Sequence, residues 1–146
     1  MGLRLISVRR RPYLARWTIL ETPFFSIKLH FIFESDPDPE LHDHPWWFVS
    51  LVLGGGYWEM FADPFESSRV VVDSAGQAKF SPVKPAKWRG WLSLAFRKAV
   101  TPHRVVLQPG GYAVTLLLTG PRTRNWGFLC RDGWKSWETF RAAKSP

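Results

Sequence analysis

Glycine and proline divide this chain into short segments, and this division limits the folds that it can adopt. The 146 residues include 11 glycines and 12 prolines. The stretches between them are short and rich in aromatic and branched apolar side chains. In residues 25–33 an apolar side chain occupies every second position, which is typical of a β-strand. Many short strands closed by Gly and Pro turns predict an all-β chain, either a sandwich or a barrel.

Further strands are expected at residues 42–53, 57–61 and 112–118 because these stretches are apolar and bounded by turn residues. The three glycines at 54–56 should form a tight turn between the first two of these strands.

The two ends of the chain differ from the rest. Residues 1–16 carry five arginines and are expected to form a basic N-terminal arm or an edge strand. Residues 132–143 are expected to form a short helix or an irregular segment, with Asp132 or Ser136 as the cap. No internal repeat or linker interrupts the sequence, so we expect a single domain over residues 1–146.

Three of the four histidines occupy positions suited to holding one metal ion. His42 and His44 are two residues apart, so on a strand their imidazoles would share one face. His103 comes from a distant strand and would complete the set, leaving open positions for water or substrate. The sequence therefore predicts one divalent transition metal ion, Fe(II), Zn, Mn or Ni, bound by His42, His44 and His103.

The sequence around these histidines resembles the cupin superfamily. It reads Leu41-His42-Asp43-His44-Pro45-Trp46, followed by Gly-Gly-Tyr-x-Glu at 55–59. It is similar to a group of short cupin-like proteins of bacteria and phages, over roughly residues 28–140. The resemblance implies a double-stranded β-helix, the jelly-roll barrel of cupins. Two features depart from the cupin pattern: Phe48 stands where many cupins carry a fourth ligand, Glu, and the usual motif before His103 is degraded.

Four further residues are expected near the site. Glu59 follows the glycine turn, where it would serve as a fourth ligand or general base, or else lie at the barrel surface. His30 lies on the less apolar face of its strand, as an acid–base residue or as a structural one. Asp43 should point away from its neighbouring histidines. Trp46 should point inward and make the pocket apolar.

Composition restricts the cellular setting and the partners. The net charge of +8 predicts either a surface for an anionic partner or a basic surface without one. The single cysteine, Cys130, fits a reducing compartment. No apolar run approaches the roughly 20 residues that cross a bilayer. A cytoplasmic protein without membrane association is the expectation.

Three functions are compatible with these observations. The favoured one is a mononuclear metal-dependent enzyme, of oxygenase or isomerase type, that acts on a small and anionic molecule. The second is a non-catalytic cupin module that binds a small ligand. The third is a nucleic-acid-associated protein that contacts phosphates through the arginines of residues 4–16. Cupins often form dimers, so a homodimer is a further expectation of the resemblance.

Overall fold

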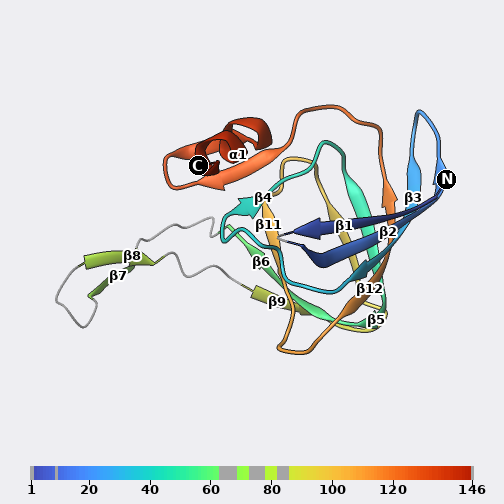
Figure 1. Ribbon diagram of the computed structural model, residues 1–146, viewed down its shortest axis with the longest axis horizontal. Helices are drawn as coiled ribbons and strands as arrows, with labels where there is room; N and C mark the ends of the chain where they lie inside the picture. Colours follow the sequence, from blue (N-terminus) through green and yellow to red (C-terminus); the bar gives the residue numbers. More distant parts are fainter. Residues whose placement is uncertain (1, 9, 63–68, 73–77, 82–85, 146) are drawn as a thin grey trace.

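The short extended segments pair into two six-stranded antiparallel sheets, shown in Figure 1. The computed structural model describes residues 2–8, 10–62, 69–72, 78–81 and 86–145. The first sheet contains, in spatial order, β1 (Gly2–Val8), β2 (Arg11–Glu21), β3 (Ser26–Ile32), β12 (Ala113–Thr119), β5 (Phe48–Gly55) and β10 (Leu94–Arg97). The second contains β14 (Gly133–Ser136), β13 (Gly127–Cys130), β4 (Leu41–His42), β11 (His103–Val106), β6 (Tyr57–Phe61) and β9 (Ala86–Arg89). A separate two-stranded sheet pairs β7 (Arg69–Val72) with β8 (Ala78–Ser81).

Side chains from both sheets meet in the hydrophobic core. Leu14, Ile32, Val52 and Ala113 come from the first sheet and Tyr57 from the second, and all five are buried. The expectation of an all-β chain is therefore confirmed. Among the described residues the two sheets do not close into a continuous barrel, since each keeps two edge strands.

The arginine-rich N-terminus is part of the first sheet. β1 is an edge strand, which is one of the two alternatives expected for residues 1–16. It pairs with β2 along its length. β2 continues to Glu21 and pairs with β3. This pairing fixes the direction of Arg16, which faces the space between the sheets.

The chain ends in a helix, α1 (Trp137–Lys144), which begins after Ser136. The Ser136 hydroxyl accepts a hydrogen bond from the Thr139 backbone N–H, so Ser136 is the cap. The ring of Phe140 stacks on that of Phe128 with centroids 3.9 Å apart. The helix is shorter than expected because residues 133–136 pair with β13 instead. The described part of the chain has no helix that is long and apolar enough to cross a membrane.

The expectation of one strand over residues 42–53 is wrong. β4 ends at His42, β5 begins at Phe48, and the two strands belong to different sheets. Pro45 lies in the link between them and has no N–H to continue a strand ladder. Two carbonyls of the link instead accept hydrogen bonds from a loop, Pro45 O from the Thr123 N–H and Trp47 O from the Gly120 N–H. The link thus crosses from one sheet to the other beside the histidines.

The glycines where β5 ends give a prediction for stability; Gly54 and Gly55 are its last two residues, and Gly56 alone separates it from β6. Gly55 has φ +61° and a Cβ there would lie 2.0 Å from the Tyr112 carbonyl oxygen, which also accepts the Gly56 N–H. Gly110 has φ +70° with nothing within 4 Å of its would-be Cβ. Both alanine variants lose about 1 kcal/mol through backbone strain. Gly55→Ala should lose about 2 kcal/mol more because backbone atoms clash. Urea unfolding measures the difference, and equal losses would contradict it.

Candidate metal centre and its cavity

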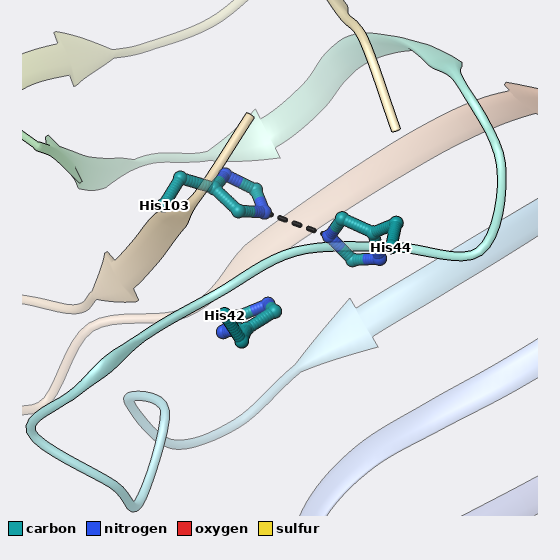
Figure 2. Close-up of side chains that lie close together, drawn as sticks. All are labelled: His42, His44 and His103. Atoms are coloured by element: carbon teal, nitrogen blue, oxygen red, sulfur yellow. Dashed lines mark hydrogen bonds between the residues drawn. The ribbon is translucent and has the colours of Figure 1, made fainter. Parts of the chain in front are cut away.

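The three histidines of the sequence motif lie together between the sheets, as Figure 2 shows. His42 is the last residue of β4, His44 lies in the link that crosses to β5, and His103 is the first residue of β11. β4 and β11 pair directly, with His103 opposite His42. The three ring centroids are 4.9–5.1 Å from one another. The convergence therefore comes from strand pairing and from the bend after His42, not from alternation along one strand.

A buried carboxylate stands behind each of the two strand-borne histidines. His103 Nδ1 lies 2.9 Å from Glu59 Oε1, and His42 Nδ1 lies 3.6 Å from Asp36 Oδ2. Glu59 also accepts hydrogen bonds from Arg89 and Arg97 at 2.6–2.8 Å. These contacts hold both rings with Nδ1 toward a carboxylate, and metal-binding histidines are commonly oriented in this way.

Glu59 is only 1% exposed and does not line the cavity. Burial raises its pKa, but hydrogen bonds from His103 and Arg97 outweigh burial and bring the pKa down to about 2. Both of its oxygens already accept hydrogen bonds. In this geometry Glu59 is therefore neither a fourth ligand nor a surface residue. Its carboxylate instead holds the ring of His103.

Asp36 is fixed as firmly as Glu59. The Tyr13 hydroxyl donates to Asp36 Oδ1, and the Val105 N–H donates to Oδ2 at 2.7 Å. The Asp36 backbone N–H in turn donates to the Val105 carbonyl. A loop residue that precedes Pro37 is therefore tied to β11, which brings its carboxylate to His42.

Two of the three donor nitrogens have the spacing of ligands on a single ion. His44 Nε2 and His103 Nε2 are 2.8 Å apart, and the ligand atoms of the three histidines all lie within 4.8 Å of one another. Two nitrogens that each lie about 2.1 Å from one ion, at a right angle, are about 3.0 Å apart. Burial lowers the pKa of His42 and His44, so both rings are neutral at pH 7 and keep a lone pair for a metal.

The histidines open onto a cavity of about 390 Å³ between the sheets. Trp46 lines it, as expected, and so does Phe48, whose ring lies 4.9 Å from that of His44. The cavity is not apolar throughout, however, because three arginines also line it. They come from separate parts of the chain: Arg16, Arg122 and Arg141.

His30 lies on the cavity wall and is paired with one of these arginines. Arg16 Nε donates to His30 Nε2 at 3.1 Å. Burial, Arg16 and Lys28 together bring the pKa of His30 down to about 3. His30 is therefore neutral at pH 7 and serves as the hydrogen-bond acceptor that orients the Arg16 guanidinium.

This lowered pKa predicts a pH dependence of folding. The unfolded chain binds a proton at His30 below about pH 6.5, whereas the folded protein does so only near pH 3. The stability that neutral His30 contributes is thus present above pH 6.5 and lost as the pH falls. In metal-free protein, His30→Gln should lower the slope of unfolding free energy against pH by about 1.4 kcal/mol per unit between pH 6 and 4. Denaturant unfolding checks this, and parallel slopes would contradict it.

Asp43 points away from the histidines, as predicted, and it is buried rather than at the surface. Its carboxylate accepts the Gly127 N–H at 2.7 Å and the Trp134 indole N–H at 2.8 Å, and pairs with Arg124 at 2.8 Å. Arg124 also donates to the His44 carbonyl. This network fixes the segment that carries both motif histidines against β13 and β14.

Several site residues could not be recognised from the sequence. Asp36 and Tyr13 carry no motif, and the cavity arginines lie far apart in the chain. For Arg16 the only signal was the excess of arginine near the N-terminus, which gave no direction for its side chain.

No family model matches this sequence, and no curated protein matches it. Solved structures do match the fold. The polyketide cyclase RemF from Streptomyces resistomycificus is 14% identical with a TM-score of 0.60, over 99% of this chain and 89% of RemF. The Fe(II) form of HppE is 12% identical with a TM-score of 0.59, over 81% of this chain and 55% of HppE.

A third match is a protein from Ralstonia eutropha JMP134 assigned as a mannose-6-phosphate isomerase. It is 16% identical with a TM-score of 0.55, over 77% of this chain and 88% of that protein. This chain thus spans about half the length of HppE and most of the other two. These proteins have cupin-type folds. The fold expected from the histidine motif is therefore confirmed: the chain folds as a cupin-type jelly roll with a short C-terminal helix.

Proposed function

We propose that this protein is a mononuclear metal-dependent enzyme, of oxygenase or isomerase type, that acts on a small anionic molecule. The observation that carries the proposal is the position of the three histidines at the wall of an arginine-lined cavity. HppE has a similar fold and its structure is that of an Fe(II) form, which supports a metal ion at this site. The protein from Ralstonia eutropha is assigned as an isomerase of mannose-6-phosphate, which is an anionic sugar. This assignment supports an anionic substrate.

His42, His44 and His103 would hold the ion, as three neutral imidazoles that leave coordination positions open toward the cavity. Such an ion supplies either redox chemistry with dioxygen, if it is iron, or Lewis-acid polarisation of a substrate oxygen. Glu59 and Asp36 act through the histidines that they contact and are positioning residues.

Arg16, Arg122 and Arg141 would bind the anionic group of the substrate. Guanidinium groups suit carboxylates and phosphates because they donate paired hydrogen bonds. Among the residues that the structure describes, Asp36 is the only acidic one on the cavity wall, and it accepts hydrogen bonds from Tyr13 and Val105. His30 keeps Arg16 directed along the wall, while the rings of Trp46 and Phe48 limit the access of water.

Cobalt(II) loading tests the proposal without knowledge of the substrate. Metal-free protein is loaded with Co(II), and inorganic phosphate or a short carboxylate is added at constant ionic strength. We expect the visible Co(II) spectrum to change on anion binding. Arg122→Gln should weaken that binding about ten-fold. Arg11→Gln is the matched control, because Arg11 is exposed on β2 and does not line the cavity.

The second candidate, a non-catalytic module that binds a small ligand, is favoured by Phe48. Its ring packs beside His44, where many cupins carry a fourth ligand. A Co(II) spectrum that no anion alters would favour that candidate over the enzyme. Protein that binds no metal would overturn the enzyme and leave the binding module, which does not require a metal ion.

A further inference from the structure

Lys28 is a buried lysine on the side of the first sheet that faces the cavity. In the strand register it lies opposite Leu117 of β12, and Leu117 lines the cavity. Ile27 and Leu29 alternate with it along β3 and point to the opposite side of the sheet. Because Lys28 is only 7% exposed, its side chain is enclosed at the cavity wall and does not extend into bulk water.

The amine of Lys28 lies against an aromatic ring instead of a hydrogen-bond acceptor. Its Nζ is 4.3 Å from the centroid of the Trp46 ring, and Trp46 also lines the cavity. Within the described part of the chain, no carboxylate, hydroxyl or carbonyl oxygen accepts a hydrogen bond from this amine. Lys28 is therefore a buried polar group whose partner is not supplied by the described residues.

Two other enclosed cations of this protein are paired with a carboxylate. Arg89 and Arg97 both donate hydrogen bonds to Glu59. An ammonium group that leaves water without such a partner loses hydration free energy that nothing replaces. For Lys28 this cost falls on the protonated form alone, so the neutral amine is favoured.

The surroundings of Lys28 lower its pKa accordingly. Burial is the largest cause, and the charge of Arg16 adds to it. Glu21 acts in the opposite sense, but it is exposed at the end of β2. A lysine that is desolvated beside another cation holds more neutral amine near pH 7, and neutral amine is the nucleophilic form.

The two residues that the sequence predicted as catalytic leave this role open. Glu59 accepts hydrogen bonds from His103 and two arginines, and it does not line the cavity. His30 accepts the Arg16 N–H. Both are thus engaged by other protein groups, whereas the described residues leave the amine of Lys28 available to a ligand.

We propose that Lys28 is the nucleophile of this cavity and forms an imine with small anionic aldehydes and α-keto acids. The Nζ lone pair adds to the carbonyl carbon, and a C=N bond then replaces the C=O bond. The neutral amine gives up both of its protons, which leave with the carbonyl oxygen as one molecule of water. Buried lysines of other proteins carry out this chemistry.

The cavity arginines select among carbonyl compounds. Arg16, Arg122 and Arg141 would hold a carboxylate or phosphate on the compound that reacts with Lys28. This preference for an anion rests on the proposed function, whereas the reactivity of the amine does not. The two parts can therefore be tested separately.

Reductive trapping locates the reactive amine without knowledge of the substrate. The protein as purified is treated with glyoxylate, an aldehyde that carries a carboxylate, and with cyanoborohydride, which reduces an imine to a stable secondary amine. Digestion and mass spectrometry give the labelling rate of each lysine. Lys98 is the internal control, because it is exposed.

Lys28 should be labelled at least about ten-fold faster than Lys98 at pH 7. An ordinary lysine holds roughly 0.04% neutral amine at this pH, and each unit by which the pKa falls raises that fraction about ten-fold. The labelling rate of Lys28 should also level off at a lower pH than that of Lys98. Lys28→Met should remove the fast labelling, and Lys98→Arg should retain it. If Lys28→Met does not fold by circular dichroism, the rates at each lysine of the wild type decide the question.

Formaldehyde, a carbonyl compound without charge, separates the amine from the arginines. Fast labelling of Lys28 by both reagents, with inorganic phosphate slowing only the reaction with glyoxylate at constant ionic strength, would support the whole proposal. Fast labelling by formaldehyde alone would overturn the anionic class of substrate and the role of the arginines in the proposed function. If neither reagent labels Lys28 faster than Lys98, the proposal is wrong, and the metal centre and its arginines are unaffected.

Discussion

Glu59→Gln is expected to lower the free energy of unfolding by about 3–5 kcal/mol, since it removes the anion from a buried group of cations. The carboxylate receives hydrogen bonds from Arg89, Arg97 and His103, and it is 1% exposed. A glutamine amide fits the same space but cannot neutralise two guanidinium groups. Zinc affinity should also fall by about 10–100-fold, because the ring of His103 loses its anionic partner.

Calorimetry and urea unfolding test these two effects separately. Glu138→Gln is the control, since Glu138 is exposed and bonded to Asn125, and its midpoint should not move. The pKa of about 2 predicts that the contribution of Glu59 is present above pH 4.5 and is lost as the pH falls toward 2. A Glu59→Gln protein with wild-type stability and zinc affinity would contradict a positioning role for Glu59.

Asp43→Ala is expected to cost about 3 kcal/mol, because three buried or half-buried donors lose their acceptor. They are the Gly127 N–H, the Trp134 indole and the Arg124 guanidinium. Asp43→Asn should lose less, since its amide oxygen still accepts the Gly127 N–H. The fluorescence of Trp134 should change in the alanine variant. Equal losses in the alanine and asparagine variants would show that the hydrogen bond to Gly127 contributes nothing.

The histidine site was accessible to sequence reasoning because its signal is local. His42 and His44 are neighbours in the chain, and His103 begins an apolar strand after a proline. The reason given for their convergence was nevertheless wrong, since β4 ends at His42 and His44 lies outside the strand. The chain leaves the second sheet after His42, and strand pairing of His42 with His103 brings these two rings together.

The cavity chemistry was less accessible because its residues meet only through tertiary structure. Arg16 comes from β2, Arg122 from a loop and Arg141 from the helix. Arg89 and Arg97, which hold Glu59, come from opposite sheets. No spacing along the chain relates such residues, so composition gave their charge without their position.

The alternation of apolar and polar residues in β3 did not show which face of the strand lies inside the protein. The apolar set that includes Ile27, Leu29 and Phe31 resembles a face that packs in a core. The set that includes Lys28 and His30 resembles a solvent-exposed face. The structure reverses this order, because His30 lines the cavity and Lys28 is buried, while Ile27, Leu29 and Phe31 lie on the other side of the sheet. Periodicity identifies two faces of a strand but does not say which of them faces the interior.

Metal analysis of untagged protein tests the central claim most directly. Plasma mass spectrometry compares the wild type with a His42→Ala/His103→Ala variant, after purification and after reconstitution with Fe(II), Zn, Mn or Ni. His30→Gln serves as the control, because His30 holds Arg16 and is not one of the three clustered ligands. The account predicts about one ion per chain in the wild type and the control, and none in the double variant. A wild type that takes up no metal after reconstitution, or a double variant that retains it, would contradict the three-histidine site.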